Sequence, residues 1–242
     1  MAESSNPKRP RRQTKLPDSD ITTAPYDPLN YANLARSCVL ELLEQPIEAL
    51  LLERTFNGAG VYALFYVGDF EPYRAYRIDD VASSGRPIYV GKADPKGGRT
   101  GYEKGAVSQK RELYDRIREH GRSLNAVENL RLADFYCRYL VVEPLWIRIV
   151  ERFLIEDFRP PWNGCLGGFG IHNPGGNRPQ EISWWDAMHP DRPQALKWKV
   201  PLKYTRDHDD AKRRLRAWLA RPLEQRQVTV DDDPSSKNDG GD

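Results

Sequence analysis

The first third of the chain changes from a helical pattern to a run of strand patterns. Apolar residues recur at helical spacing over residues 29–52, where Pro46 interrupts them. Residues 58–68 (GAGVYALFYVG) are rich in β-branched and aromatic residues and have Gly at both ends, which predicts a strand. Two further short strands are predicted at residues 73–78 and 86–93.

The middle of the chain predicts a helix, a strand and a second helix. An amphipathic pattern over residues 108–124 predicts a helix that stops at Gly121. Residues 132–142 alternate like a strand, and residues 144–158, which begin with Pro144, return to helical spacing. Strands followed by helix, strand and helix predict an α+β domain.

The C-terminal third is less periodic. Residues 159–170 (RPPWNGCLGGFG) break the preceding helix, and residues 171–201 are rich in Gly, Pro, Trp and His. Residues 209–219 predict the last helix. We expect residues 1–30 to form a disordered basic arm and residues 229–242 a disordered acidic tail.

Composition is that of a globular protein with one substantial core. The chain has 242 residues, of which 39% are hydrophobic, which is enough for such a core. No apolar run approaches the ~20 residues of a membrane span, and the N-terminus does not resemble a secretory signal, so we expect no membrane partner. Cys38, Cys137 and Cys165 are far apart and odd in number, which indicates a reducing compartment without disulfides or a zinc site.

Charge is nearly balanced overall but unevenly distributed. The net charge of +2 does not indicate a polyanionic partner. A basic arm at residues 8–15 (KRPRRQTK) and a basic helix at residues 211–221 (AKRRLRAWLAR) suit local contact with nucleic acid. They equally suit a solvated surface.

The strand at residues 86–93 ends in a Gly-Lys pair that first suggests a phosphate-binding loop. A Walker loop needs two glycines five residues apart, followed by Lys and Ser or Thr. Here Lys92 precedes the glycine-rich stretch and Ala93 follows it, so we expect no nucleotide cofactor.

Glu151 lies inside the apolar stripe of its helix, four residues after Ile147 and three before Leu154. Burying a lone carboxylate costs several kcal/mol unless the group is paired or binds a cation. Glu151 is therefore either a residue at the edge of the stripe, paired with Arg148 or Arg152, or a metal ligand.

Four further residues are candidates for a polar site. Arg116 and His120 are four residues apart, so their side chains lie together at the edge of the apolar face of their helix. Tyr62 in GVY and Tyr89 in YVG stand at comparable points of two strands. Each residue alone also has an ordinary explanation, as a solvated Arg, a structural His or a packed Tyr with one hydrogen-bond partner.

The order of these residues along the chain strongly resembles the GIY-YIG nuclease superfamily. GVY at residues 60–62 and YVG at residues 89–91 match its two signatures, with Val at both Ile positions. Arg116 on the next helix, Glu151 on a later helix and Asn163 in RPPWNG continue the match in the correct order.

This resemblance implies a nuclease core over residues 60–163, with a small antiparallel or mixed β-sheet flanked by helices. A helical segment over residues 31–59 precedes the core, and an extension for DNA recognition or dimerisation over residues 164–228 follows it. The two signature tyrosines are 27 residues apart, wider than the usual hairpin of the family, so residues 66–86 form an insertion.

The insertion, His120 and the Gly- and Trp-rich tail resemble a subgroup of type II restriction endonucleases on this scaffold, which cut short palindromic GC-rich DNA sites. The resemblance implies a sequence-specific double-strand DNA endonuclease of the prokaryotic cytoplasm. Because a palindrome has two-fold symmetry, we expect a homodimer. A homing or repair nuclease and a catalytically inactive DNA-binding protein remain alternatives.

The resemblance also implies a role for each residue of the site. Glu151 would hold Mg²⁺, for which Mn²⁺ can substitute, and Arg116 would bind the phosphate. Tyr62 would take a proton from water, while Tyr89 and His120 orient it or relay the proton; the residues leave open whether Tyr62 or His120 is the final acceptor.

The remaining expected roles concern fixation and DNA binding. Asn163 would fix a tyrosine or the phosphate by hydrogen bonding. Arg or Lys can read guanine in the major groove. We therefore expect DNA contacts from Lys92, Arg178, Arg192 and Lys199.

Overall fold

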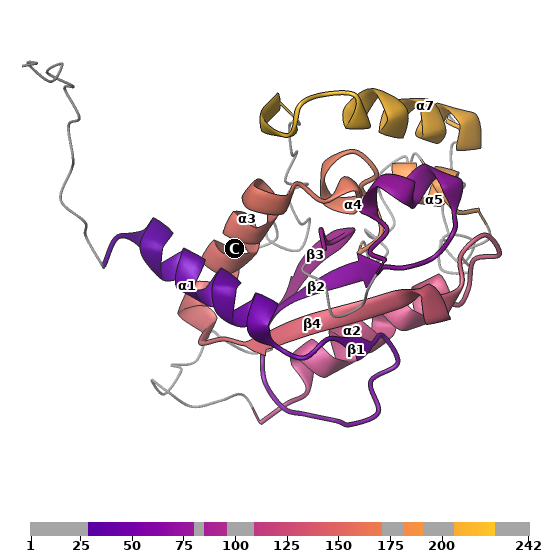
Figure 1. Ribbon diagram of the computed structural model, residues 1–242. Helices are drawn as coiled ribbons and strands as arrows, with labels where there is room; N and C mark the ends of the chain where they lie inside the picture. Colours follow the sequence, from indigo (N-terminus) through magenta and orange to yellow (C-terminus); the bar gives the residue numbers. More distant parts are fainter. Residues whose placement is uncertain (1–28, 80–84, 96–108, 171–181, 191–205, 226–242) are drawn as a thin grey trace, which may run out of the picture.

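The structure is a computed structural model that describes residues 29–79, 85–95, 109–170, 182–190 and 206–225. It contains a four-stranded antiparallel sheet with helices on both faces, which confirms the predicted α+β class (Figure 1). Some predicted features lie outside the described residues. These are the candidate DNA contacts Arg178, Arg192 and Lys199, residues 1–28 of the basic arm and the tail at residues 229–242.

The sheet has the strand order β1-β4-β2-β3. Its strands are β1 (Glu48–Ala49), β2 (Gly60–Tyr66), β3 (Tyr89–Ala93) and β4 (Phe135–Val141). Every residue of β2 is buried, because this strand pairs on both sides and is covered on both faces. In the register of the sheet, Tyr62 lies opposite Gly91 of β3 and opposite Tyr139 of β4.

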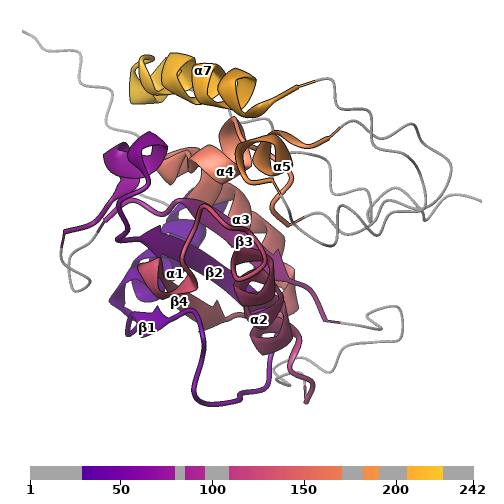
Figure 2. The same cartoon turned by 90° about the vertical axis from the view of Figure 1, so that its right-hand side faces the viewer.

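Alternate residues of β2 enter two separate apolar clusters. Val61, Ala63 and Phe65 pack against α1 (Tyr31–Glu44) and α3 (Pro144–Phe158). The opposite face, which includes Tyr62, packs against α2 and the C-terminal helices (Figure 2). These helices are α2 (Glu112–Leu124), α4 (Pro161–Gly164), α5 (Trp184–Met188) and α7 (His208–Leu219).

The described part of the C-terminal extension belongs to the same core as the sheet. Trp162, Trp185 and Trp218 are all buried and share one cluster with Tyr62. A capping box between Asp207 and Asp210 begins α7, which lies at the opposite end of the molecule from β1 (Figures 1 and 2). No helix among the described residues is long and apolar enough to cross a membrane.

Residues 73–78 do not form the predicted strand. They fall largely in a 3-10 helix, η1 (Glu71–Tyr76), which has Pro72 in its first turn. Tyr73 and Tyr76 are three residues apart and both buried, and a 3-10 helix places residues at that spacing on the same side. The pattern YRAYRI resembled a strand because the segment is too short to distinguish the two-residue period of a strand from the three-residue period of a 3-10 helix.

The insertion is anchored by a buried histidine. The Tyr73 hydroxyl is hydrogen-bonded to His189 Nε2, and His189 Nδ1 lies 2.8 Å from Asn129 Oδ1. His189 follows α5, so this contact joins the insertion to the C-terminal extension. The insertion is therefore part of the packed body at η1.

Two helix boundaries also differ from the prediction. The helix α2 continues through Gly121 to Leu124, whose fully buried side chain holds the last turn against the core. The N-terminal helix ends at Glu44, and residues 48–49 of the predicted helical stretch pair instead with β4. Short 3-10 turns, η2 (Leu132–Asp134) and η3 (Leu223–Gln225), complete the described elements.

Candidate active site

Tyr62 and His120 form a buried hydrogen-bonded pair. Tyr62 comes from the centre of β2 and His120 from the third turn of α2, and the Tyr62 hydroxyl is bonded to His120 Nε2. Both residues are at most 2% exposed. The sheet and the helix that covers it thus bring together two residues that are 58 positions apart.

Tyr89 completes an aromatic triangle with this pair. Its ring centroid lies 6.2 Å from that of Tyr62 and 5.3 Å from that of His120. Tyr89 starts β3, and Gly91 follows it on the same face of the strand. The lack of a side chain at Gly91 leaves room for the Tyr62 ring.

Asn163 fixes the strand that carries Tyr89. Its Oδ1 accepts a hydrogen bond from the Val90 N–H at 2.8 Å, and its Nδ2 donates to the Val90 carbonyl at 2.8 Å. The Trp162 backbone N–H donates to the Ile88 carbonyl at 3.2 Å, so α4 is bonded both to β3 and to the residue just before it. Asn163 therefore fixes the backbone of β3 one residue after Tyr89, and its expected hydrogen bonding to a tyrosine or to phosphate stays a prediction.

Arg116 is held one turn before His120 on α2. Its Nη2 donates to the Gly170 carbonyl at 2.7 Å, and its Nη1 lies 3.3 Å from Glu119 Oε2. The side chain keeps 21% exposure, so the guanidinium is oriented by the protein and still reaches solvent. Such a fixed cation is suited to phosphate oxygens.

Glu151 lies on α3 with a half-buried side chain. The proposed ordinary partner Arg152 pairs instead with Glu156, with Nε 2.7 Å from Oε1. Glu151 is close enough to Tyr62 for its charge to raise the pKa of the phenol. The three elements β2, α2 and α3 thus contribute to one electrostatically connected site.

Burial is the main cause of the high pKa of Tyr62. It raises the pKa of Tyr62 well above the usual range, and electrostatic interactions with Tyr89 and with the Glu151 carboxylate act in the same direction. The charge of Arg116 and its hydrogen bonding to the phenol act in the opposite direction. Tyr62 is therefore a neutral phenol at physiological pH, able to donate a hydrogen bond to His120.

Lys92 does not share the face of Tyr62. It alternates with Gly91 along β3, so it lies on the side of Val90, which packs with α3. Its Nζ forms an ion pair with Asp94 Oδ2 at 2.6 Å, and the side chain is 17% exposed. The expected DNA contact from Lys92 would have to compete with this pair.

Two residues beside the site had no place in the sequence prediction. The Phe169 ring stacks on His120 with centroids 4.5 Å apart, and Gly170 accepts the bond from Arg116. The local sequence around them, GGFG at residues 167–170, indicates only the end of a helix and does not point to a functional site.

Comparison with known proteins gives the family of the chain. No curated protein matches the chain. The family model described as the Eco29kI GIY-YIG domain matches residues 54–214, from before β2 into α7. This match spans more than half of the chain and includes Tyr62, Tyr89, Arg116, Glu151 and Asn163. The chain therefore belongs to the Eco29kI family of GIY-YIG restriction endonucleases, and it is a nuclease that acts on DNA.

Proposed function

We propose that the chain is a metal-dependent type II endonuclease that hydrolyses both strands of DNA at a short palindromic GC-rich site. Phosphodiester hydrolysis is supported by the hydrogen bond between Tyr62 and His120, which lies beside Arg116 and Glu151. The type II activity and the GC-rich palindrome are proposed from the resemblance of the sequence to that subgroup.

The pair offers a route for the proton of the attacking water. A phenolate at pH 7 costs about 4 kcal/mol from the reference pKa of ~10, and burial raises the pKa of Tyr62 further. A standing phenolate is thus disfavoured. In the proposed step the Tyr62 oxygen takes a proton from water as its own proton passes to His120 Nε2. The water oxygen then bonds to phosphorus, and the bond to the leaving oxygen breaks. The leaving group departs as an alkoxide and takes a proton from solvent water.

Arg116 is proposed to bind a non-bridging oxygen of the scissile phosphate. Its contacts with Gly170 and Glu119 fix the direction of the guanidinium. The side chain is 21% exposed, so a phosphate can approach the cation from solvent. The orientation of the guanidinium is set before substrate arrives, which favours stabilisation of the charge that develops on phosphorus.

Glu151 is proposed as the protein ligand of Mg²⁺ or Mn²⁺. The described residues contain no group of three or more His, Cys, Asp or Glu that could form a full cage. A single carboxylate fits Mg²⁺, because this ion usually keeps several waters and adds substrate oxygens. When bound, the ion would neutralise phosphate charge and stabilise the leaving oxygen.

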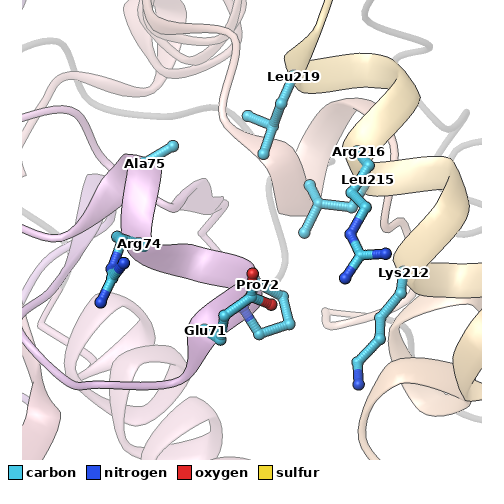
Figure 3. Close-up of a pocket in the computed structure, with 8 residues that line it drawn as sticks. All are labelled: Glu71, Pro72, Arg74, Ala75, Lys212, Leu215, Arg216 and Leu219. Atoms are coloured by element: carbon cyan, nitrogen blue, oxygen red, sulfur yellow. The ribbon is translucent and has the colours of Figure 1, made fainter.

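A basic groove between η1 and α7 is proposed to contact the DNA backbone. It has a volume of about 370 Å³, and Leu215 and Leu219 point from α7 towards η1 across an apolar floor (Figure 3). Its lining residues are Glu71, Pro72, Arg74, Ala75, Lys212, Leu215, Arg216 and Leu219. The insertion and the C-terminal extension, the latter expected to serve DNA recognition or dimerisation, meet at this groove.

The charge of the groove supports a polyanionic partner. The lining residues include three cations, Arg74, Lys212 and Arg216, and a single carboxylate, Glu71. Within the described ranges no ion pair neutralises these cations, whereas Arg213 on the same helix pairs with Asp210. Like charges at i and i+4, as at Lys212 and Arg216, weaken a helix by about 0.2–0.5 kcal/mol, which a bound phosphate would relieve.

A homodimer is proposed because one such site cuts one strand and a palindrome presents two equivalent phosphates. Large apolar side chains are exposed in the segment before β2, outside residues 60–163. These are Leu29, Tyr31, Leu40 and Leu51, with exposures of 76%, 68%, 56% and 62%. This segment is our candidate for the dimer contact.

Incubation with plasmid DNA and Mg²⁺ tests the proposal. Discrete fragments that end at one repeated sequence would support a type II enzyme. Nicks that depend on DNA structure would indicate a repair nuclease. Binding without cleavage would indicate an inactive DNA-binding protein and contradict the proposed reaction.

A further inference from the structure

Phe169 and Gly170 contact three of the residues assigned to catalysis. The Phe169 ring stacks on His120 with an interplanar angle of 19° and meets Tyr89 edge-on, with centroids 5.1 Å apart. The Gly170 carbonyl accepts a hydrogen bond from Arg116 Nη2 at 2.7 Å. We propose that Phe169 and Gly170 form a positioning element for the active site, an inference that rests on the proposed function.

The element is rigid because it is buried and its backbone path is constrained. Phe169 is 2% exposed and packs on Trp162 and Trp185, at centroid distances of 4.6 and 5.0 Å. Gly168 has φ +119°, and a Cβ there would lie 2.2 Å from Ser183 Oγ. Ser183 caps α5 by accepting a hydrogen bond from the Asp186 N–H.

Phe169 restricts the orientation of the His120 ring. The torsion that turns an imidazole about its Cβ–Cγ bond has broad minima, so the helix alone does not fix the direction of Nε2. Tyr62 binds Nε2 at one edge of the ring, and Phe169 covers one flat face. Together they hold Nε2 on the Tyr62 hydroxyl. An aromatic face also favours a cation, which suits a histidine that receives a proton.

Gly170 fixes the other two side chains. A Cβ at this position would lie 2.6 Å from Tyr89 Oη and 3.1 Å from Arg116 Nη2. The missing side chain lets both polar groups approach the backbone, and the carbonyl then orients the guanidinium. The C-terminal extension thereby supports the active site directly, through a segment beyond Asn163.

A double-mutant cycle between Phe169 and His120 tests the proposal in the full-length protein. F169L should lower the single-turnover cleavage rate at saturating DNA by about 10- to 100-fold and change KM by less than about twofold, because it loosens the reacting geometry. In an H120A background the same change should have almost no further effect on the rate. G170A should lower the rate similarly, and this effect should be smaller in an R116A background, where only the clash with Tyr89 Oη remains.

The control variant is F135L, which makes the same change at a buried phenylalanine of the same cluster. Phe135 touches Tyr66 and Trp162 rather than the catalytic rings. At equal loss of thermal stability, F135L should keep the cleavage rate. Equal rate losses in F169L and F135L would overturn the proposal. So would an F169L rate loss of the same size in the H120A background as in the parent.

A spectroscopic measurement gives a result that does not depend on activity. The side-chain ¹⁵N signals of His120, assigned with H120A, should show one fixed, hydrogen-bonded Nε2 in the parent and exchange-broadened signals in F169L. Unchanged signals in folded F169L would overturn the proposal. Failure of the proposed function can be distinguished from failure of this proposal, because the parent protein would then not cleave DNA with Mg²⁺ at all.

Discussion

Tyr62 and Gly91 lie directly opposite each other on β2 and β3, and a Cβ on Gly91 would lie 2.3 Å from Tyr62 Oη. Gly91 of the YVG motif thus leaves the space that the side chain of Tyr62 from the GVY motif fills. Because Tyr62 is fully buried, its ring has little room to move aside. The contact joins the two motifs into one site.

G91A should therefore displace the Tyr62 hydroxyl from His120. We expect cleavage to fall by about 10²-fold, typical of a misplaced catalytic group, while metal-free DNA binding stays close to that of the parent. Single-turnover rates and a DNA titration measure the two quantities. Gly121 offers the control, since a Cβ there meets nothing closer than 3.8 Å. Full activity of G91A would contradict the importance of the Tyr62 position.

E151Q should abolish cleavage and keep DNA binding in the absence of metal. Glutamine preserves the volume of the side chain but is a poor ligand for Mg²⁺, which prefers charged oxygen. The matched control is E156Q on the same helix, where Glu156 is exposed and pairs with Arg152. Isothermal titration with Mn²⁺ in the presence of DNA should detect metal binding in E156Q and none in E151Q. Cleavage by E151Q at the parent rate would reject Glu151 as the metal ligand.

The double variant K212Q/R216Q should weaken DNA binding and make the binding constant less dependent on salt. Each lost phosphate contact lowers the slope of log K against log[salt] by about 0.9, so the slope should fall by up to about 2. Affinity would be measured in an E151Q background to prevent cleavage. R213Q serves as the control, because Arg213 already pairs with Asp210. An unchanged slope in the double variant would exclude the groove as a DNA contact.

The raised pKa of Tyr62 predicts a loss of stability at alkaline pH. In the unfolded chain this phenol ionises near its reference pKa of ~10, while in the folded protein it stays protonated. The folded state then binds more protons, so the free energy of unfolding falls as pH rises above ~10, by at most about 1.4 kcal/mol per pH unit from this group. Urea unfolding between pH 8 and 11 should show this loss in the parent. It should be smaller in Y62F, and identical slopes would contradict the burial effect.

Local pattern was sufficient for several elements of the fold. Gly and β-branched or aromatic residues predicted β2, and Pro144 with an apolar stripe predicted α3 with its observed bounds. The order of five signature residues was enough to indicate the family, which the match over residues 54–214 confirms. The strand and the helix depend on residues a few positions apart, and their spacing can be taken directly from the sequence.

Contacts between distant residues were decided only by the tertiary structure. Asn163 binds the backbone of Val90, 73 positions away, and Gly170 orients Arg116 from 54 positions away. The segment at Glu71–Tyr76 became a 3-10 helix because its tyrosines pack into the core beside the C-terminal extension. No spacing along the chain encodes such pairs. They arise because the sheet, α2 and the C-terminal helices close around one buried cluster, and the packing of that cluster selects which side chains meet.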